Sequence, residues 1–204
     1  LVEVPLAYEQ LGEVSETSDI PDSFSTARPL QVLFLGQVNL RKGVLELGGA
    51  IESLEGLPVE WTIVGDGDEW LIEKLRSLPQ TRVLEGVPRG NVAHYYREAD
   101  VFILPTHSDG FAITQLEAAS CGLPVIASRF CGEVVQSGTN GILLEEVSTE
   151  RISTAILALL EKPTDLALYR KNMQRQKYCT MRDLSDNLSG LRDKIDSTRN
   201  GNND

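Results

Sequence analysis

The residues of this chain most able to do chemistry are two acids, Asp109 and Glu117, which stand eight positions apart. Asp109 follows an apolar, strand-like segment, residues 101–104, and in open α/β sheets ligands bind beyond the carboxyl ends of the strands. If the segment between the two acids is helical, they lie roughly 12 Å apart along the helix axis. This distance is too long for a carboxylate pair that shares one proton, and too long for the acid and nucleophile of a glycosidase. The spacing favours two acids that hold hydroxyl groups at opposite ends of one elongated ligand.

Two cations follow another strand-like segment, in the loop of residues 36–43. Lys42 is a compact charge suited to phosphate, and Arg41 can bond two oxygens at once. Helix starts expected after this loop and at residues 110–112 offer free N–H groups and positive dipole ends, which could hold a diphosphate without a metal. A diphosphate between two hydroxyl-binding acids predicts a nucleotide sugar as the ligand.

Simpler interpretations of these residues stay open. Arg41 and Lys42 could belong to a solvated loop, because the segment has neither the G-x-G-x-x-G nor the P-loop fingerprint. Glu117 could lie on a solvated helix face, although its apolar neighbours Leu116 and Ala118 argue against this. An unrelated doubly wound domain would need a phosphate fingerprint that the sequence lacks.

The alternation of strand-like and helix-like segments predicts an α/β domain over residues 29–163, with a Rossmann-like, doubly wound parallel sheet of about six strands. The expected strand order 3-2-1-4-5-6 sets the first and fourth strands side by side. It therefore brings Gln37, Arg41, Lys42, Asp109, Gly110 and Glu117 to one crevice. Strands are expected at residues 30–35, 59–64, 81–84, 101–104, 125–127 and 141–144. Helices are expected at 44–54, 69–78, 91–97 (capped by Asn91), 111–120 and 149–160 (capped by Ser148).

The flanking segments and the composition bound the function. Residues 1–28 are expected to be an interdomain lead-in, 164–199 a helical segment and 200–204 a disordered tail. The net charge of −11 argues against nucleic acid or an anionic membrane as a partner, and no apolar run reaches the roughly 20 residues of a membrane span. Three cysteines without C-x-x-C spacing predict reduced thiols in a cytoplasmic setting, and the two distant histidines predict no metal site.

Several motifs in combination resemble the GT-B glycosyltransferases of family 4, the retaining "group 1" enzymes. The most specific is the segment 117–128 (EAASCGLPVIAS), preceded by an E-x7-E position that Asp109 and Glu117 occupy. Further motifs of the family match this chain in the same order, at residues 34–36 with 42–43, 63–67, 83–88, 99–105 and 132–143. The resemblance covers about residues 30–160 and implies the carboxy-terminal half of a GT-B fold. Residues 2–6 resemble the crossing from an amino-terminal domain that is otherwise absent.

The resemblance implies transfer of a sugar from a nucleotide-sugar donor to an acceptor hydroxyl with retained anomeric configuration, and with no cofactor or metal. Three residues would be catalytic: Lys42 would bind the donor diphosphate, Glu117 the ribose hydroxyls, and Asp109 the transferred sugar near its reacting carbon. The other expected substrate-binding residues are Gly36, Gln37, Arg41, Val87 (whose backbone would face the nucleobase), Gly110, Phe111 and Ala112. The missing amino-terminal domain would hold the acceptor, so we expect little or no transfer by this chain alone.

The sequence departs from the family pattern at three positions. Gln37 replaces the usual Arg, Asp109 replaces the usual Glu, and Ala112 stands where Gly is common. Arg41 is a candidate to supply the charge missing at Gln37. The departures keep a second hypothesis open, in which the domain binds a nucleotide sugar without turning it over.

Overall fold

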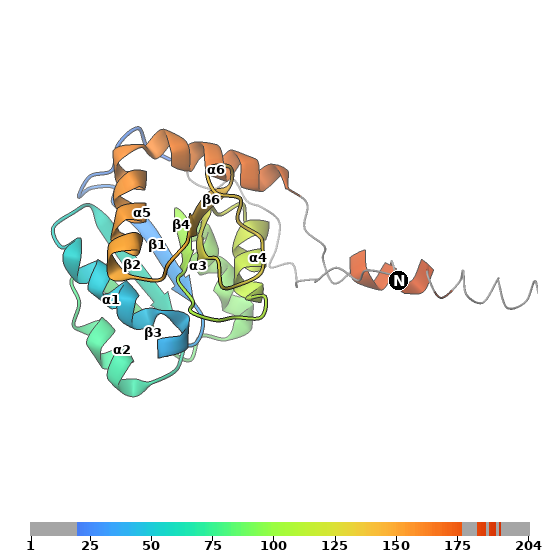
Figure 1. The fold of residues 1–204 in the computed structure, drawn as a ribbon, viewed down its shortest axis with the longest axis horizontal. Helices are drawn as coiled ribbons and strands as arrows, with labels where there is room; N and C mark the ends of the chain where they lie inside the picture. Colours follow the sequence, from blue (N-terminus) through green and yellow to red (C-terminus); the bar gives the residue numbers. More distant parts are fainter. Residues whose placement is uncertain (1–19, 177–182, 187, 191, 193–204) are drawn as a thin grey trace, which may run out of the picture.

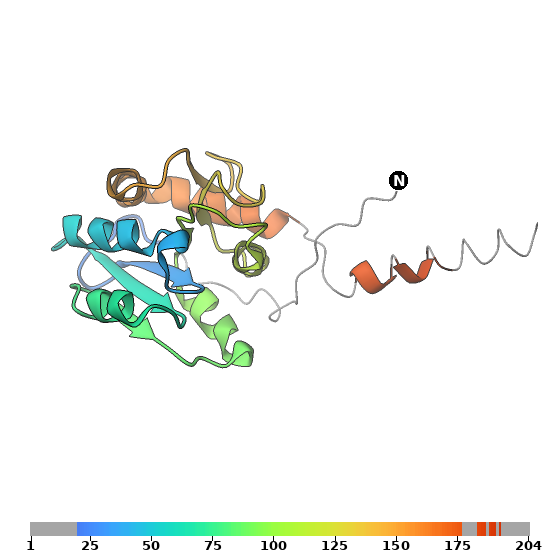
Figure 2. The same cartoon turned by 60° about the horizontal axis from the view of Figure 1, so that its bottom comes forward.

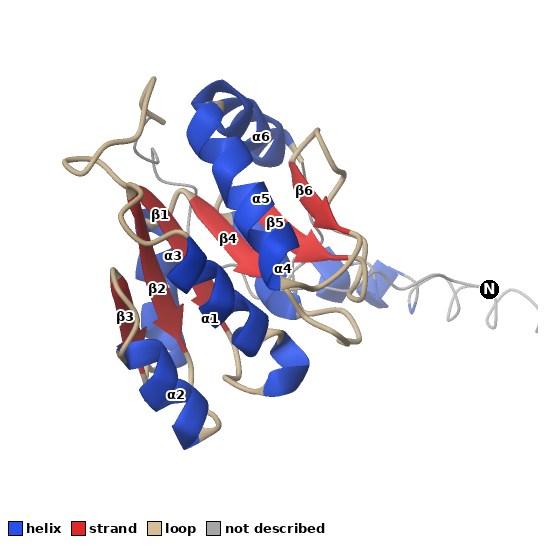
Figure 3. Ribbon diagram, turned by 60° about the vertical axis from the view of Figure 1, so that its left-hand side comes forward, coloured by secondary structure: helices blue, strands red, loops and turns tan. Residues whose placement is uncertain are grey.

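The computed structural model describes residues 20–176, 183–186, 188–190 and 192, and its centre is a six-stranded sheet (Figure 1). All paired strands are parallel, in the order β3-β2-β1-β4-β5-β6, which confirms the predicted doubly wound topology. Figure 3 shows β3 at one edge of the sheet and β6 at the other. The strands are β1 (Leu30–Leu35), β2 (Val59–Val64), β3 (Thr81–Leu84), β4 (Val101–Leu104), β5 (Val125–Ser128) and β6 (Gly141–Leu144).

Helices cover both faces of the sheet because the strands bury apolar side chains on each side. On β1, Val32 and Phe34 pack into the core beneath α1, α2 and α5, whereas Leu33 packs into the core shared with α3 and α4. Every residue of β4 and β5 is buried, as expected for central parallel strands. The helices are α1 (Val44–Ser53), α2 (Glu69–Arg76), α3 (Val92–Glu98), α4 (Ile113–Ser120), α5 (Thr149–Glu161) and α6 (Pro163–Arg175).

Two helix starts differ from the sequence prediction. α4 begins at Ile113 rather than at Phe111, because Ala112 has a left-handed backbone (φ 58°) that cannot continue a right-handed helix toward the N-terminus. Asn91 makes no capping side-chain bond and instead ends a short 3-10 helix, η2 (Arg89–Asn91), that leads into α3. The predicted cap at Ser148 is confirmed, since its side chain accepts a hydrogen bond from the amide of Arg151.

α6 packs on the domain and does not project from it. It contacts α4 and α5 (Figure 2), with Leu166 in one hydrophobic core and Met173 in the other. Arg170 donates hydrogen bonds to the carbonyls of Ala99 and Asp100, just before β4. The predicted tail at 200–204 and most of the lead-in lie outside the described residues.

Candidate functional site

The loops that follow β1 and β4 touch at the carboxyl edge of the sheet, because Gly43 lets them approach closely. Gly43 has φ +68°, and a Cβ there would lie 1.8 Å from the carbonyl oxygen of Pro105. The amide of His107 and the hydroxyl of Thr106 both donate to the carbonyl of Arg41, at 2.8 and 3.1 Å. The backbone of the β4 loop is thus fixed directly against the residue before Lys42.

Lys42 and Asp109 form an ion pair across these two loops. The Lys42 ammonium donates to Asp109 Oδ2, and the two side chains are only 11% and 16% exposed. Lys42 ends the short 3-10 helix η1 (Leu40–Lys42), whose N-terminus is capped by the Asn39 side chain. Lys42 is therefore buried at the meeting point of the loops, and the solvated-loop interpretation is wrong for this residue.

Arg41 and Gln37 take different positions from Lys42. Arg41 is exposed and donates from Nη1 to the carbonyl of Ser108 at 2.8 Å, so its guanidinium braces the loop that carries Asp109. Gln37 is also exposed, and its side-chain oxygen accepts from Asn39 at 3.4 Å. The expected crevice therefore brings Arg41, Lys42 and Asp109 together, whereas Gln37 belongs to a neighbouring cavity.

The loop of residues 108–112 is fixed by hydrogen bonds to the loop that follows β5. The amide of Asp109 donates to the carbonyl of Phe130 at 2.9 Å. Gln115 is fully buried, and its side-chain amide donates to the carbonyls of Phe111 and Gly132. Sequence reasoning missed Gln115, although its position directly before Leu116, in a helix that also carries Ala118 and Ala119, was an available signal. Gly110, Phe111 and Ala112 thus lie in a braced loop ahead of α4, not within its first turn.

Glu117 is buried, at 5% exposure, and has its own set of partners. Its Oε2 accepts a hydrogen bond from the hydroxyl of Tyr96 at 3.0 Å, and its Oε1 lies 3.5 Å from Nη2 of Arg89. Burial of Tyr96, and then the negative charge of Glu117, raise the pKa of the tyrosine well above its ordinary value. The solvated-face interpretation of Glu117 is therefore wrong. Tyr96 and Arg89 escaped sequence reasoning because no spacing links them to Glu117.

A cavity of about 430 Å³ opens at the carboxyl ends of β1 and β2, and Lys42, Asp109 and Glu117 are not among the residues that line it. It contains Gly36, Gln37 and Val87, which the sequence placed in the donor site, together with Val92 at the start of α3. Its full lining is Leu35, Gly36, Gln37, Val64, Gly65, Asp66, Gly67, Val87 and Val92.

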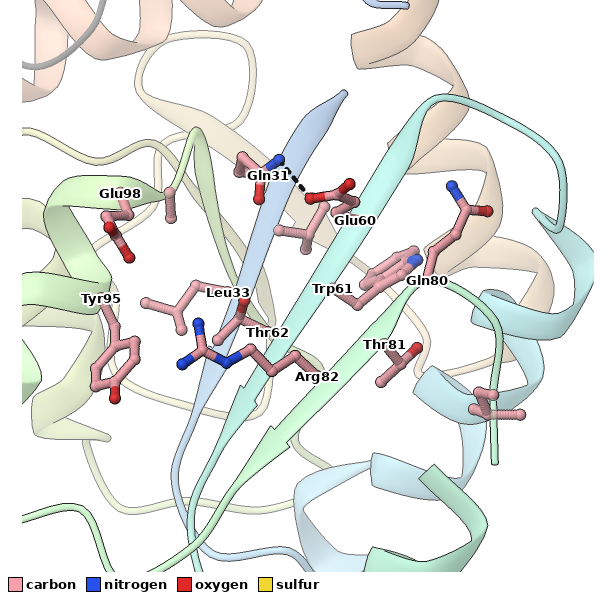
Figure 4. A pocket seen from close by; sticks show the side chains of 13 residues that line it. Gln31, Leu33, Glu60, Trp61, Thr62, Gln80, Thr81, Arg82, Tyr95 and Glu98 are labelled. Atoms are coloured by element: carbon pink, nitrogen blue, oxygen red, sulfur yellow. Dashed lines mark hydrogen bonds between the residues drawn. The ribbon is translucent and has the colours of Figure 1, made fainter. Parts of the chain in front are cut away.

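A second cavity of about 440 Å³ lies over β1, β2 and β3 and contains none of the predicted site residues (Figure 4). Gln31 and Glu60 line it and are hydrogen-bonded to each other at 3.0 Å, and Arg82 and Glu98 also face it. The first cavity, unlike the second, lies at the same carboxyl edge of the sheet as the loops that carry Lys42 and Asp109.

The family follows from a direct comparison. The family model of the group 1 glycosyl transferases matches residues 29–162. The chain belongs to the group 1 glycosyltransferases. Over 158 residues it is 28% identical to the glycogen synthase of Mycobacterium tuberculosis, a match that covers 73% of this chain and 38% of the relative. The chain thus spans well under half the length of this relative.

Solved structures of group 1 glycosyltransferases and related enzymes share the fold. The C-terminal domain of a glycosyl transferase group 1 family protein (LpcC) from Francisella tularensis matches with a TM-score of 0.62 at 19% identity, covering 71% of this chain and 82% of that domain. Anabaena HepE in complex with UDP-glucose matches with a TM-score of 0.69 at 20% identity, covering 81% of this chain and 50% of that protein. The predicted fold class, the Rossmann-like carboxy-terminal half of a GT-B glycosyltransferase, is confirmed. None of the helices in the described part of the chain is both long and apolar enough to cross a membrane.

Proposed function

We propose that this domain is the donor-binding half of a retaining glycosyltransferase, which transfers a sugar from a nucleotide-sugar donor to an acceptor hydroxyl. The observation that carries the proposal is the mostly buried Lys42–Asp109 pair, which precedes the helix that carries the buried Glu117, at the edge of the sheet where a cavity opens. The likeness to HepE, solved with UDP-glucose, supports the same class of ligand.

In this proposal each charged residue acts on a different part of the donor. Lys42 turns from Asp109 to the diphosphate and stabilises the negative charge that develops on the departing nucleotide, an effect that is strong in a site shielded from water. Asp109 then faces the sugar near its reacting carbon, where positive charge develops in an oxocarbenium-like state. Glu117 accepts hydrogen bonds from the ribose hydroxyls, and the backbone at Val87 faces the nucleobase.

The reaction requires an acceptor, which we assign to an amino-terminal domain as partner. The acceptor hydroxyl approaches on the face from which the nucleotide leaves, so that the anomeric configuration is retained by front-side displacement. Phosphate is held by Lys42 and by the backbone of residues 110–112, without a metal or another cofactor. The free thiols of Cys121 and Cys131 support a cytoplasmic setting.

A non-catalytic nucleotide-sugar-binding module is the second candidate. It is favoured by Gln37, an exposed, uncharged side chain at the cavity where the family usually has Arg, and by Arg41, which is bonded to the Ser108 carbonyl rather than directed to a phosphate site. Both candidates bind the donor, so a binding assay tests the site and a turnover assay separates the two.

The binding test measures the melting temperature of this chain with UDP, GDP and ADP, because a ligand that binds only the native state stabilises it. We expect one nucleotide to raise the melting temperature, and Lys42→Ala to reduce that rise. No shift with any of them at millimolar concentration would contradict both candidates. For turnover, a longer protein that includes the acceptor half should release nucleotide from the matching donor, and binding without release selects the module.

A further inference from the structure

We propose that Tyr96 is a positioning residue for nucleotide binding, which orients the carboxylate of Glu117 so that its outward oxygen meets the ribose hydroxyls. The inference rests on the proposed function and adds a residue on a different helix to that site. Tyr96 lies on α3 and Glu117 on α4, twenty-one positions apart in sequence.

The two oxygens of Glu117 face different surroundings. Oε2 accepts from the fully buried hydroxyl of Tyr96, whereas Oε1 faces the guanidinium of Arg89, whose side chain is 65% exposed. The inner oxygen, Oε2, is thus bonded within the core, and the outer oxygen, Oε1, is directed toward the exposed side chain of Arg89. A carboxylate offers only acceptors, and ribose hydroxyls are donors, so the outer oxygen has the chemistry that a ribose requires.

Tyr96 is built to keep this orientation. Its ring is packed against Phe102 of β4, with centroids 5.7 Å apart, and the residue is completely buried. Its hydroxyl is 3.0 Å from Glu117 and 3.4 Å from the carbonyl of Thr114, and a single proton favours the nearer, charged acceptor. Because burial and the charge of Glu117 raise the tyrosine pKa, the hydroxyl stays protonated and remains a donor.

Glu117 needs a hydrogen-bond donor such as Tyr96 because its carboxylate is buried. A buried carboxylate without hydrogen-bond donors either takes up a proton or turns toward water, and in both cases its outer oxygen no longer accepts from a ligand in a fixed direction. The hydroxyl of Tyr96 fixes the orientation of the carboxylate by bonding Oε2 only, and leaves Oε1 to accept from a ligand. Binding then needs no reorganisation of the carboxylate beyond the replacement of Arg89 by the ribose.

The test compares the dissociation constants of UDP and of 2′,3′-dideoxy-UDP, which lacks both ribose hydroxyls, by titration calorimetry. If the thermal-shift panel selects another base, the corresponding ribo and dideoxy nucleotides are used. We expect the wild-type chain to prefer the ribonucleotide by about tenfold or more, as for the loss of one or two hydrogen bonds to a charged group. Tyr96→Phe should lower this preference to about threefold or less, mostly through weaker ribonucleotide binding.

Three comparisons make the result specific. Tyr95→Phe makes the same chemical change at the adjacent, partly exposed tyrosine, and should keep the wild-type preference. Glu117→Gln should lose the preference, and adding Tyr96→Phe to it should change little more, because both residues act through one carboxylate. The ratio of two dissociation constants does not depend on the folded fraction, so a loss of stability cannot imitate the effect.

The outcomes separate this inference from the proposed function. If the wild-type chain binds no nucleotide, the proposed function fails and the inference with it. If the wild-type chain prefers the ribonucleotide and Tyr96→Phe keeps that preference in full, the donor site stands and the positioning role of Tyr96 is wrong. Equal binding of both nucleotides by the wild type would overturn the role of Glu117 and of Tyr96 together.

Discussion

Lys42 and Asp109, sixty-seven positions apart in the chain, neutralise each other at the junction of the loops that follow β1 and β4. The cation proposed to bind phosphate and the acid proposed to face the sugar are therefore one unit before any donor arrives. A donor diphosphate must compete with Asp109 for the ammonium of Lys42, and the acid released by that exchange becomes available to the sugar.

Asp109→Asn should consequently strengthen the binding of nucleoside diphosphate while weakening sugar transfer. The substitution frees the Lys42 ammonium and removes a negative charge near the phosphates, so we expect UDP, or the nucleotide selected by the panel, to bind a few-fold more tightly. Titration calorimetry measures this, with the nucleoside as the control because it carries no phosphate and should bind unchanged. If Asp109→Asn weakens diphosphate binding as Lys42→Ala does, the acid serves mainly to hold Lys42 in place.

Gln115→Leu should destabilise the domain, because it removes the amide that bonds the carbonyls of Phe111 and Gly132. A buried polar group left without its partner costs about 1–3 kcal/mol, so we expect a loss in that range in urea denaturation. Gln136→Leu changes an exposed glutamine in the same way and should have little effect. Equal stabilities of the two variants would show that the braced loop does not depend on Gln115.

Asp100→Asn should be the most destabilising of these substitutions. Asp100 is fully buried, accepts two hydrogen bonds from Arg28 at 2.7 and 2.8 Å and one from the amide of Gln31, and lies 3.6 Å from Arg170. The pairing with Asp100 also raises the pKa of Arg28. Removing one charge from a buried cluster of this kind costs about 3–5 kcal/mol.

The matched control for Asp100 is Glu145→Gln, which breaks an exposed pair with Arg129 at 3.4 Å. An exposed pair contributes about 0–1 kcal/mol, so the free energy of unfolding should hardly change. Urea denaturation of the two variants measures both free energies of unfolding. A decrease below about 1 kcal/mol for Asp100→Asn would exclude a stabilising role for the cluster.

The thiol of Cys131 should react slowly with alkylating reagents at neutral pH. Burial, followed by the charge of Asp109, raises its pKa from 9.0 to about 11, while Lys42 opposes the shift. Since the thiolate is the reactive form, its population at pH 8 should be about 100-fold below that of an ordinary thiol. The rate of iodoacetamide labelling in a Cys121→Ser, Cys179→Ser variant measures this, and rapid labelling at pH 8 would contradict it.

The same shift gives a stability prediction with a definite sign. Between pH 9 and about 11 the folded thiol keeps its proton and the unfolded thiol has lost it, so the free energy of unfolding falls as the pH rises through that window. Below pH 9 this contribution is fully present. Cys131→Ser should remove this part of the slope, and an unchanged slope would assign it to other groups.

The strands were predictable because they are short runs rich in apolar residues, four of them followed within two residues by Gly or Pro. The bounds of five of the six strands were predicted as the structure has them. The strand order followed from the alternation with helices, since parallel strands need crossovers that cover both faces. The start of α4 was not predictable in the same way. Nothing local forces a left-handed backbone on Ala112, and the bonds from Gln115 and Asp109 to other loops are long-range contacts.

The sequence by itself determined the family and the sheet and singled out Lys42, Asp109 and Glu117 as candidate site residues, because these depend on residue type and local spacing. Only the tertiary structure decided which partners they have. Asp109 pairs with Lys42 because β1 and β4 are neighbours and Gly43 lets their loops touch. Glu117 pairs with Tyr96 because α3 and α4 share one core on the same face of the sheet. The ion-pair and hydrogen-bond partners of each acid thus come from contacts between distant segments, and no pattern along the chain records these contacts.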